Sequence, residues 1–530
     1  MIETRRAFRG MVTAPHDLAA RAGLRILEEG GSAVEAMVAM AAAIAVVYPH
    51  MNGPGGDNFW IVARPGAAPI GIDACGAAAG LASADYYRAA GHGAIPARGP
   101  LAALTVAGAV SGWQAALALD AAANARPLPL ARLFEDAIGH ARDGVPVSRT
   151  LARNAAAKRA ELEPVPGFSS VYAPGGRLVE VGDRLTQPRV AATLEHLARA
   201  GLDDFYRGDL ARSLAGDLER AGAPLRLGDL ERHRALTLPP LSVAVGPHRV
   251  FNMPPPTQGL ASLMILALYA RLGVAEGEGF EHLHGLVEAT KQAFIIRDRH
   301  VGDPAYMSRP ATDFLADALL DDLAGRIDRA RALPWPHVAP PGDTVWLGAI
   351  DRDGTAVSFI QSVYWEFGSG LVLPESGVTW QNRGTSFSLD SNHCNALQPN
   401  RRPFHTIQPA YAELADGRRM VYGTMGGEGQ PQTQAAVFSR HVLHGMPLQA
   451  AVSAPRWLLG RTWGASATNL KIESRVDPAV VSALVAAGHE VETVGAYEEM
   501  MGHAGAIVLS PSGLFEGAAD PRSDGAAMGF

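Results

Sequence analysis

The sequence changes character at one junction, Gly342-Asp343-Thr344, and this change constrains the fold more than any other feature. Residues 331–342 contain four prolines and no hydrophobic periodicity, which is typical of an exposed connector where a chain tolerates cleavage. Directly after it, residues 344–350 and 355–361 flank Asp351-Arg352-Asp353-Gly354, a strong β-hairpin signal. The pattern therefore predicts a β-rich part that begins at Thr344 and follows a more helical part.

Other segments support an α+β architecture. Asp17 is predicted to cap a helix over residues 18–29, and Ser32 with Glu35 forms a capping box before a second, apolar and buried helix. Turn residues separate further predicted hairpins, which lie at 59–62 and 70–73, 410–414 and 419–422, and 506–509 and 514–517. Because helices and strands occur in separate runs, we expect stacked layers of sheet and helix and not a doubly wound parallel sheet.

Composition excludes several classes of protein. The 530 residues carry a net charge of −7, so there is no basic footprint for nucleic acid. Two cysteines exclude a disulfide framework and a zinc ribbon. The longest apolar run, residues 36–47, is too short to cross a bilayer, and the N-terminus lacks the apolar core of a secretory signal. We therefore expect a cytoplasmic protein with no membrane partner.

Thr344 offers a specific chemistry at the junction. A threonine hydroxyl is a weak nucleophile unless a base lies beside it, and cleavage of the preceding bond would create that base as an α-amine. An α-amine has an ordinary pKa of about 7.7–8, which suits proton transfer near neutral pH. The alternative from local sequence is that Thr344 only opens a strand, since threonine favours strands.

Several short motifs occur along the chain in a fixed order. They are Gly53-Pro54-Gly55-Gly56, Met253-Pro254-Pro255-Pro256, Glu288-Ala289-Thr290-Lys291, Gly302-Asp303-Pro304, Glu375-Ser376-Gly377, Met425-Gly426-Gly427 and Asp520-Pro521-Arg522-Ser523. Together they resemble the γ-glutamyltranspeptidase family of N-terminal-nucleophile hydrolases. The resemblance implies a four-layer αββα fold and self-cleavage between Asp343 and Thr344. The products, residues 1–343 and 344–530, would remain one structural unit, and a dimer of such heterodimers is a further expectation. It also implies a small-molecule amide substrate and no cofactor or metal.

Further stretches, at 14–16, 46–53, 104–108, 342–346, 380–384 and 455–464, are similar to one subgroup of the family. That subgroup is the oxamate amidohydrolases, which act in purine degradation. This similarity implies hydrolysis of oxamate to oxalate and ammonia. Three alternatives stay open: a γ-glutamyl hydrolase or transferase, an acylase for bulkier amides, and an uncleaved homologue that only binds a ligand.

The resemblance also implies catalytic roles. Thr344 would be the nucleophile of both self-cleavage and turnover. The backbone N–H groups of Gly426 and Gly427 would form the oxyanion hole, and Ser362 would bond the amine of the nucleophile. The simpler alternatives are a glycine turn after a strand and a strand serine that faces solvent. Asp520-Pro521-Arg522-Ser523 is expected to support the cleavage site structurally.

The substrate determinants depart from the transpeptidase pattern. The arginine that holds the glutamyl carboxylate has no counterpart in residues 77–81, and the aspartate that holds the α-amine is replaced by Ser386. The two serines of the transpeptidases correspond to His405-Thr406, and an asparagine corresponds to Tyr364. Residues 387–403 are shorter than the transpeptidase lid, which favours hydrolysis over transfer.

An arginine stands where the transpeptidases carry a glutamine, in Asn382-Arg383. Because a guanidinium can bind a carboxylate through two parallel hydrogen bonds, Arg383 is our candidate for the oxamate carboxylate. Its alternative is a surface arginine in a loop. The predicted substrate-binding set is Arg383, Tyr364, Asn382, His405 and Thr406. His282-Leu283-His284, on a predicted helix, is expected to be structural and not metal-binding.

Overall fold

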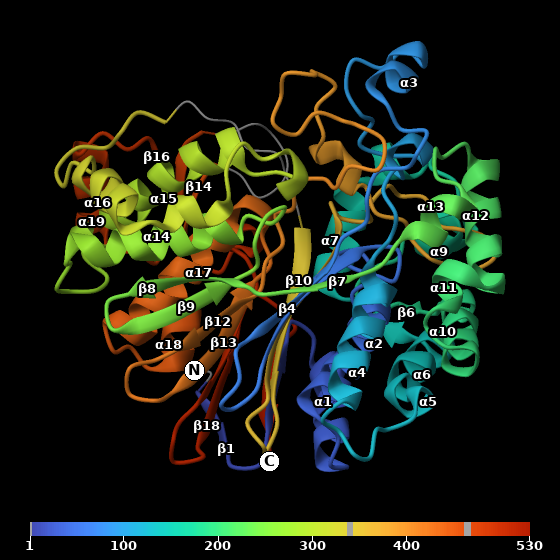
Figure 1. Cartoon of the computed structure of the whole chain (residues 1–530), viewed down its shortest axis with the longest axis horizontal. Helices are drawn as coiled ribbons and strands as arrows, with labels where there is room; N and C mark the ends of the chain where they lie inside the picture. The colour runs from blue at the N-terminus through green and yellow to red at the C-terminus, as the bar shows by residue number, and fades with distance from the viewer. Residues whose placement is uncertain (1–2, 336–342, 461–467) are drawn as a thin grey trace.

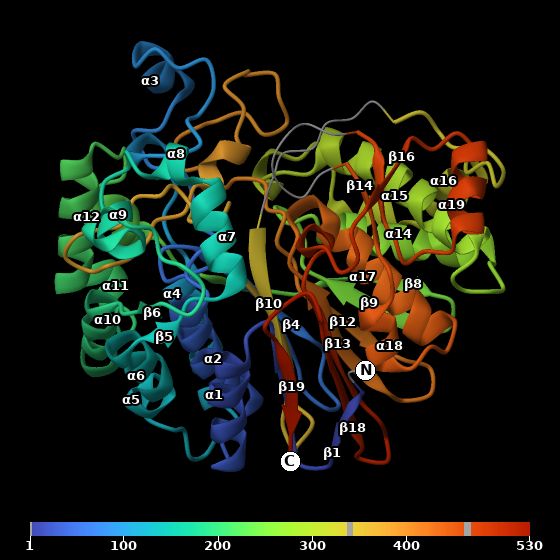
Figure 2. The same ribbon diagram turned by 180° about the vertical axis from the view of Figure 1, so that it is seen from behind.

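The computed structural model describes residues 3–335, 343–460 and 468–530. Within these ranges, two seven-stranded sheets pack face to face, and each carries helices on its outer face (Figures 1 and 2). This arrangement is the αββα fold predicted from the sequence. Two predicted features lie partly outside the described residues. They are residues 336–342 of the proline-rich connector and residues 461–464 of the similar stretch 455–464.

Both sheets are antiparallel throughout. The first has the order β1 (Arg5–Ala7), β18 (Phe515–Ala519), β17 (Ala504–Leu509), β13 (Arg419–Thr424), β12 (Ala410–Glu413), β9 (His248–Asn252) and β8 (Leu241–Val245). The second has the order β19 (Ala526–Gly529), β2 (Met11–Ala14), β10 (Asp343–Ile350), β11 (Ala356–Tyr364), β3 (Asp57–Ala63), β4 (Ile70–Ala74) and β7 (Leu236–Leu238).

The helices divide into two outer layers, on opposite sides of the sheets in both views (Figures 1 and 2). The layer on the second sheet comprises α1 (Asp17–Glu28), α2 (Ala33–Val47), α4 (Ala109–Ala121), α5 (Leu130–Leu133), α6 (Glu135–Asp143), α7 (Arg149–Ala157), α8 (Arg159–Leu162), α9 (Phe168–Tyr172), α10 (Pro188–Ala200), α11 (Asp204–Arg207), α12 (Asp209–Ala221) and α13 (Leu227–Arg232). The layer on the first sheet comprises α14 (Gly259–Leu272), α15 (Phe280–His300), α16 (Asp317–Gly325), α17 (Gln430–Phe438), α18 (Leu448–Ser453) and α19 (Pro478–Ala486).

Smaller elements complete the chain. They are α3 (Ala84–Ala89), the pair β5 (Val145–Pro146) and β6 (Arg184–Leu185), and a three-stranded sheet of β14 (Trp457–Leu459), β15 (Leu470–Glu473) and β16 (Val491–Val494). In the part of the chain that the structure describes, no helix combines the length and apolar character needed to cross a membrane.

Thr344 faces the space between the two sheets. It lies where the pairing of β10 with β11 shifts register, so strand alternation alone does not fix the direction of its side chain. Its hydroxyl bonds Ser362 Oγ, and Ser362 lies on the same face of β11 as Ile360, which packs in the core between the sheets. The candidate nucleophile is therefore enclosed by protein and not exposed at a surface.

The elements predicted from the sequence agree with the structure except at the cap of α1. The hairpins and the Ser32–Glu35 capping box are confirmed. The cap of α1 is His16 and not Asp17, because the His16 side chain accepts the hydrogen bond from the Leu18 N–H. The hairpin of β8 and β9 was not predicted.

Candidate active site

Thr344 lies at the start of β10, where the pairing with β11 shifts register between Asp343 and Val345. Its side chain is fully buried. The Thr344 hydroxyl donates to Ser362 Oγ over 3.3 Å and accepts a hydrogen bond from Gln430 Nε2, also over 3.3 Å. The orientation of the hydroxyl is therefore fixed by two hydrogen bonds, with Ser362 as the acceptor and Gln430 as the donor. Ser362 is buried, so the structure excludes a solvent-facing strand serine.

Gln430 was missed by sequence reasoning. It is the first residue of α17 and follows the Gly427–Gly429 turn. The only sequence signal was its place three residues after the glycine pair. Its contact with Thr344 depends on how β10 packs against α17, which no local pattern encodes.

The glycine pair forms the turn between β13 and α17. Gly426 has a φ of 121° and Gly427 a φ of 50°, values that side chains with a Cβ atom adopt only with strain. Their peptides precede the N-terminal end of α17, where unpaired N–H groups and the helix dipole favour negative charge. This turn is well suited to stabilise an oxyanion.

Arg383 is buried, so it is not a surface arginine in a loop. Its Cζ lies 3.6 Å from the ring centre of Tyr364, and its Nη1 donates to Thr406 Oγ1 over 3.3 Å. Its Nε and Nη2 have no hydrogen-bond partner among the described residues. Burial lowers the pKa of Arg383 to about 10, so the guanidinium remains charged at neutral pH. It therefore offers two donors to an anion.

Tyr364 connects Arg383 to the nucleophile. Its backbone has a φ of 83°, which is a strained value for a bulky residue. The Tyr364 N–H donates to Ser362 Oγ over 2.8 Å, and the same oxygen accepts the Thr344 hydroxyl. Strained backbone of this kind clusters at functional sites.

Asp57 and His405 add a second buried polar pair, of which only His405 was predicted. Asp57 is the strand partner of Ser362, and its Oδ2 lies 3.5 Å from His405 Nε2. Burial raises the pKa of Asp57 to about 7, although the N–H of Gly108 and the charge of Arg383 oppose that rise. Burial also lowers the pKa of His405 well below its usual value. The contact is therefore not an ion pair at neutral pH.

The remaining predicted residues lie nearby. Asn382 uses both ends of its amide on backbone groups, since Nδ2 donates to Ala97 O and Oδ1 accepts from the Trp365 N–H. These bonds shape the loop that carries Arg383, and a contact of Asn382 with substrate stays a prediction. Ser386 Oγ donates to the Phe404 carbonyl over 3.0 Å.

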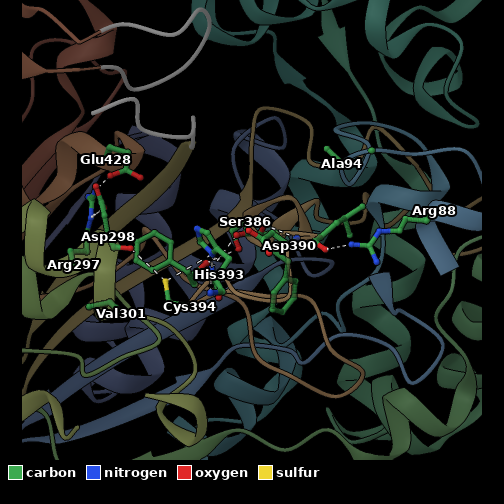
Figure 3. A pocket seen from close by; sticks show the side chains of 16 residues that line it. Arg88, Ala94, Arg297, Asp298, Val301, Ser386, Asp390, His393, Cys394 and Glu428 are labelled. Carbon is green, nitrogen blue, oxygen red and sulfur yellow. Dashed lines mark hydrogen bonds and ion pairs between the residues drawn. The ribbon is translucent and has the colours of Figure 1, made fainter. Parts of the chain in front are cut away.

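A cavity of about 830 Å³ opens beside the glycine turn (Figure 3). Glu428, which follows Gly427, lies in its wall and forms an ion pair with Arg297. Ser386 and residues 387–390 and 393–395 form another wall. The residues from 387 on belong to the segment that the resemblance predicts to be shorter than the transpeptidase lid, and they border an open space.

Comparisons with known proteins place these features in a family. The family model described as Gamma-glutamyltranspeptidase matches residues 19–530. The chain belongs to the gamma-glutamyltranspeptidase family. It is 54% identical over 521 residues to the oxamate amidohydrolase proenzyme of Klebsiella pneumoniae, with 98% of each chain covered. It is 39% identical over 523 residues to the glutathione hydrolase-like YwrD proenzyme of Bacillus subtilis, again with 98% of each covered.

A solved structure of the family has the same fold. The cephalosporin acylase from Bacillus halodurans superposes with a TM-score of 0.91 at 33% identity, covering 100% of this chain and 97% of that one. The two-sheet architecture is therefore that of the N-terminal-nucleophile hydrolases, as the resemblance implied.

The family motif Asp520-Pro521-Arg522-Ser523 is connected to the glycine turn through buried ion pairs and hydrogen bonds. Asp520 is buried and forms ion pairs with Arg456 and Arg522, and its Oδ2 accepts from the Ala504 N–H over 2.7 Å. Arg456 in turn donates to the carbonyls of Met501 and Gly502. This network holds the chain next to His503, whose carbonyl accepts from the Met425 N–H. A structural role for the motif agrees with these contacts.

The predicted histidine pair on α15 has structural hydrogen bonds. His284 lies with Glu288 and His489 in a group whose spacing would suit a metal. However, Lys291 Nζ donates to Glu288 Oε1 over 2.7 Å and to the Leu333 carbonyl over 2.6 Å. His284 also bonds His489 over 2.8 Å. The side-chain atoms of His284, His489 and Glu288 that could bind a metal thus form hydrogen bonds within the protein. Through Lys291 the group also bonds the Leu333 carbonyl, which indicates a structural role.

Proposed function

We propose that the protein cleaves its own chain before Thr344 and then hydrolyses oxamate to oxalate and ammonia. The observation that carries this proposal is the enclosure of Thr344 Oγ1 between Ser362 and Gln430, together with the two donors of Arg383 that have no hydrogen-bond partner among the described residues. The 54% identity to an oxamate amidohydrolase proenzyme supports the same substrate.

The self-cleavage step is an acyl shift. Thr344 Oγ attacks the carbonyl carbon of Asp343, and the peptide C–N bond breaks to give an ester and a free α-amine. Water then hydrolyses the ester, which leaves a carboxylate on Asp343 and restores the hydroxyl. The products are residues 1–343 and 344–530.

Turnover repeats this chemistry on the substrate. The new α-amine takes the proton of the Thr344 hydroxyl, which attacks the amide carbon of oxamate. The N–H groups of the Gly426-Gly427 turn stabilise the tetrahedral oxyanion, a contribution worth about 10²–10³ in rate per donor. Ammonia leaves with the transferred proton, and water hydrolyses the oxalyl ester. Each step needs only these groups and water.

Arg383 gives the reaction its substrate class. Its Nε and Nη2 would bind the oxamate carboxylate. The adjacent amide carbon would then face the Thr344 hydroxyl. Burial of the guanidinium makes this attraction stronger than it would be in water. We also propose that the reaction belongs to purine degradation in the cytoplasm, as the resemblance to the subgroup implies.

One test is ammonia release from oxamate by the wild type and by Thr344→Ala. We expect release by the wild type, whose denatured chain runs as two fragments. Thr344→Ala should remain one chain and release none. Ammonia release by an intact chain would contradict the proposal.

A second candidate is the hydrolysis of bulkier amides. The cavity of about 830 Å³ at Glu428 is not lined by Thr344 itself, but it adjoins the glycine turn and has room for an amide much larger than oxamate. The fold also matches a cephalosporin acylase. Assays with amides of increasing size would favour this candidate if the larger substrates gave the higher kcat/KM.

A further inference from the structure

Gln258 joins the two halves of the site through one buried side chain. It directly precedes α14, before the junction in sequence, whereas the three carbonyls to which it donates lie after the junction. Its Nε2 donates to the Thr406 carbonyl over 2.6 Å and to the Gly427 carbonyl over 2.8 Å. Its backbone N–H donates to the His405 carbonyl over 2.9 Å. One residue therefore holds both the oxyanion turn and the His405-Thr406 segment that contacts Arg383.

Arg297 fixes the orientation of the Gln258 amide. Arg297 Nη1 donates to Gln258 Oε1 over 2.8 Å, and its guanidinium stacks over the ring of Phe294 at 3.7 Å. Because arginine can only donate, the oxygen of the amide must face Arg297. Both hydrogens of the NH₂ group are then directed at the two carbonyls. The ion pair of Arg297 with Glu428 ties the same assembly to the residue after Gly427.

We propose that Gln258 is a positioning residue, which sets the spacing between the Gly426-Gly427 turn and the Arg383–Thr406 contact. This inference rests on the proposed function, because it assigns one structural element to the oxyanion and the other to the substrate carboxylate. Gln258 does not itself contact the substrate. Without its two N–H donors, the buried Thr406 carbonyl loses the hydrogen bond from Gln258, and the Gly427 carbonyl keeps only the bond from the Gln430 N–H. The link between the two segments is then broken, and they are free to shift relative to each other. A misplacement of about 1 Å at a catalytic group can cost about 10²-fold in rate.

The first experiment compares Gln258→Leu with the wild type in ammonia release from oxamate. We expect kcat to fall about 10²-fold because the oxyanion turn moves, and KM to rise because Thr406 no longer orients Arg383. Gln187→Leu is the matched control. Gln187 is also buried and donates from Nε2 to one carbonyl, that of Val46, over 2.7 Å, but it contacts none of the site residues described above. The control should keep both kcat and KM.

A second variant, Gln258→Glu, keeps the shape of the side chain and gives a pH signature. The ionised carboxylate cannot donate to either carbonyl, whereas the protonated acid can donate to one of them. We therefore expect the activity of Gln258→Glu, relative to the wild type, to rise as pH falls. A merely structural role would leave the pH profile parallel to that of the wild type. Arg297→Lys should lower kcat, as we expect for Gln258→Leu. A lysine lacks the planar guanidinium fork that bonds both Gln258 and Glu428.

The rate of self-cleavage separates this inference from the choice of substrate. Cleavage of freshly made precursor, followed on denaturing gels, needs Thr344 but no oxamate. We propose that the same Gly426-Gly427 turn also stabilises the oxyanion of the cleavage step. Slow cleavage in both Gln258 variants, with thermal unfolding like that of Gln187→Leu, supports the inference even if the wild type releases no ammonia from oxamate. If both variants cleave as fast as Gln187→Leu, and turn over any accepted amide with the same kcat and KM, the inference is overturned.

Discussion

At the scale of single residues, the buried charge of Arg383 is the feature that most needs a ligand. Two of its donors have no described partner, and unpaired buried polar groups are costly unless a ligand or water satisfies them. Replacing Arg383 by Met should raise KM for oxamate about 10- to 100-fold, since a hydrogen bond to a charged group contributes about 1.5–3 kcal/mol. Steady-state kinetics would measure this. Arg383→Lys should recover only part of the affinity because it lacks the planar fork.

A substrate without a carboxylate serves as the control for Arg383→Met. An uncharged amide of similar size should be hydrolysed at the same rate by the wild type and by Arg383→Met. An unchanged KM for oxamate in the Met variant would remove Arg383 from the substrate site.

Asp57 gives a prediction about pH. Its pKa is raised to about 7 in the folded protein, above an unfolded value of about 3.9. Between about pH 4 and pH 7 the folded state therefore binds the extra proton, and the free energy of unfolding contributed by this group falls as pH rises. In Asp57→Asn the melting temperature should fall less over that range than in the wild type.

Thermal unfolding of the purified protein across that range would measure the difference. Asp85→Asn is a suitable control, because the Asp85 side chain is 94% exposed. It should give a curve parallel to that of the wild type. A parallel curve for Asp57→Asn as well would show that the Asp57 carboxyl is already ionised at low pH.

At the scale of elements, the turn between β13 and α17 carries the oxyanion function. Gly426→Ala should lower kcat for oxamate by about 10²-fold or more, because the residue cannot keep a φ of 121° and its neighbouring N–H groups turn away. Gly445→Ala is the matched control. Gly445 also has a positive φ, of 70°, and an added Cβ would meet no atom within 4 Å. Both variants should lose stability, but only Gly426→Ala should lose kcat. Equal kcat in the two variants would contradict an oxyanion role.

The elements also show which parts of the molecule the sequence could predict. Hairpins such as β10–β11 were predictable because Asp351-Arg352-Asp353-Gly354 supplies turn residues between alternating apolar strands. Thr344, Ser362 and the glycine pair were found through motifs. Asp57, Gln258 and Gln430 were not, because their roles depend on contacts between segments up to hundreds of residues apart. A buried glutamine has no periodicity or motif of its own to mark it.

At the scale of the whole molecule, the junction at Thr344 does not separate two domains. In the second sheet, β10 and β11 pair with β2 and β3, which precede the junction. In the first sheet, β12 pairs with β9 and β18 pairs with β1. Each side of the junction therefore completes the hydrogen-bond ladders and apolar cores of the other. Cleavage would change the covalent connection but not the packing.

This interleaving predicts how the cleaved protein behaves. Fragments 1–343 and 344–530 should elute together from a sizing column without denaturant, at the position of the uncleaved Thr344→Ala chain or of its dimer. Unfolding by urea should show one shared transition, because neither fragment can close its sheets alone. Separate elution of the fragments, or two transitions that do not coincide, would mean that each fragment forms its own core. Removal of the urea should restore the Thr344→Ala chain more readily than the cleaved pair, since only the intact chain keeps the paired strands tethered.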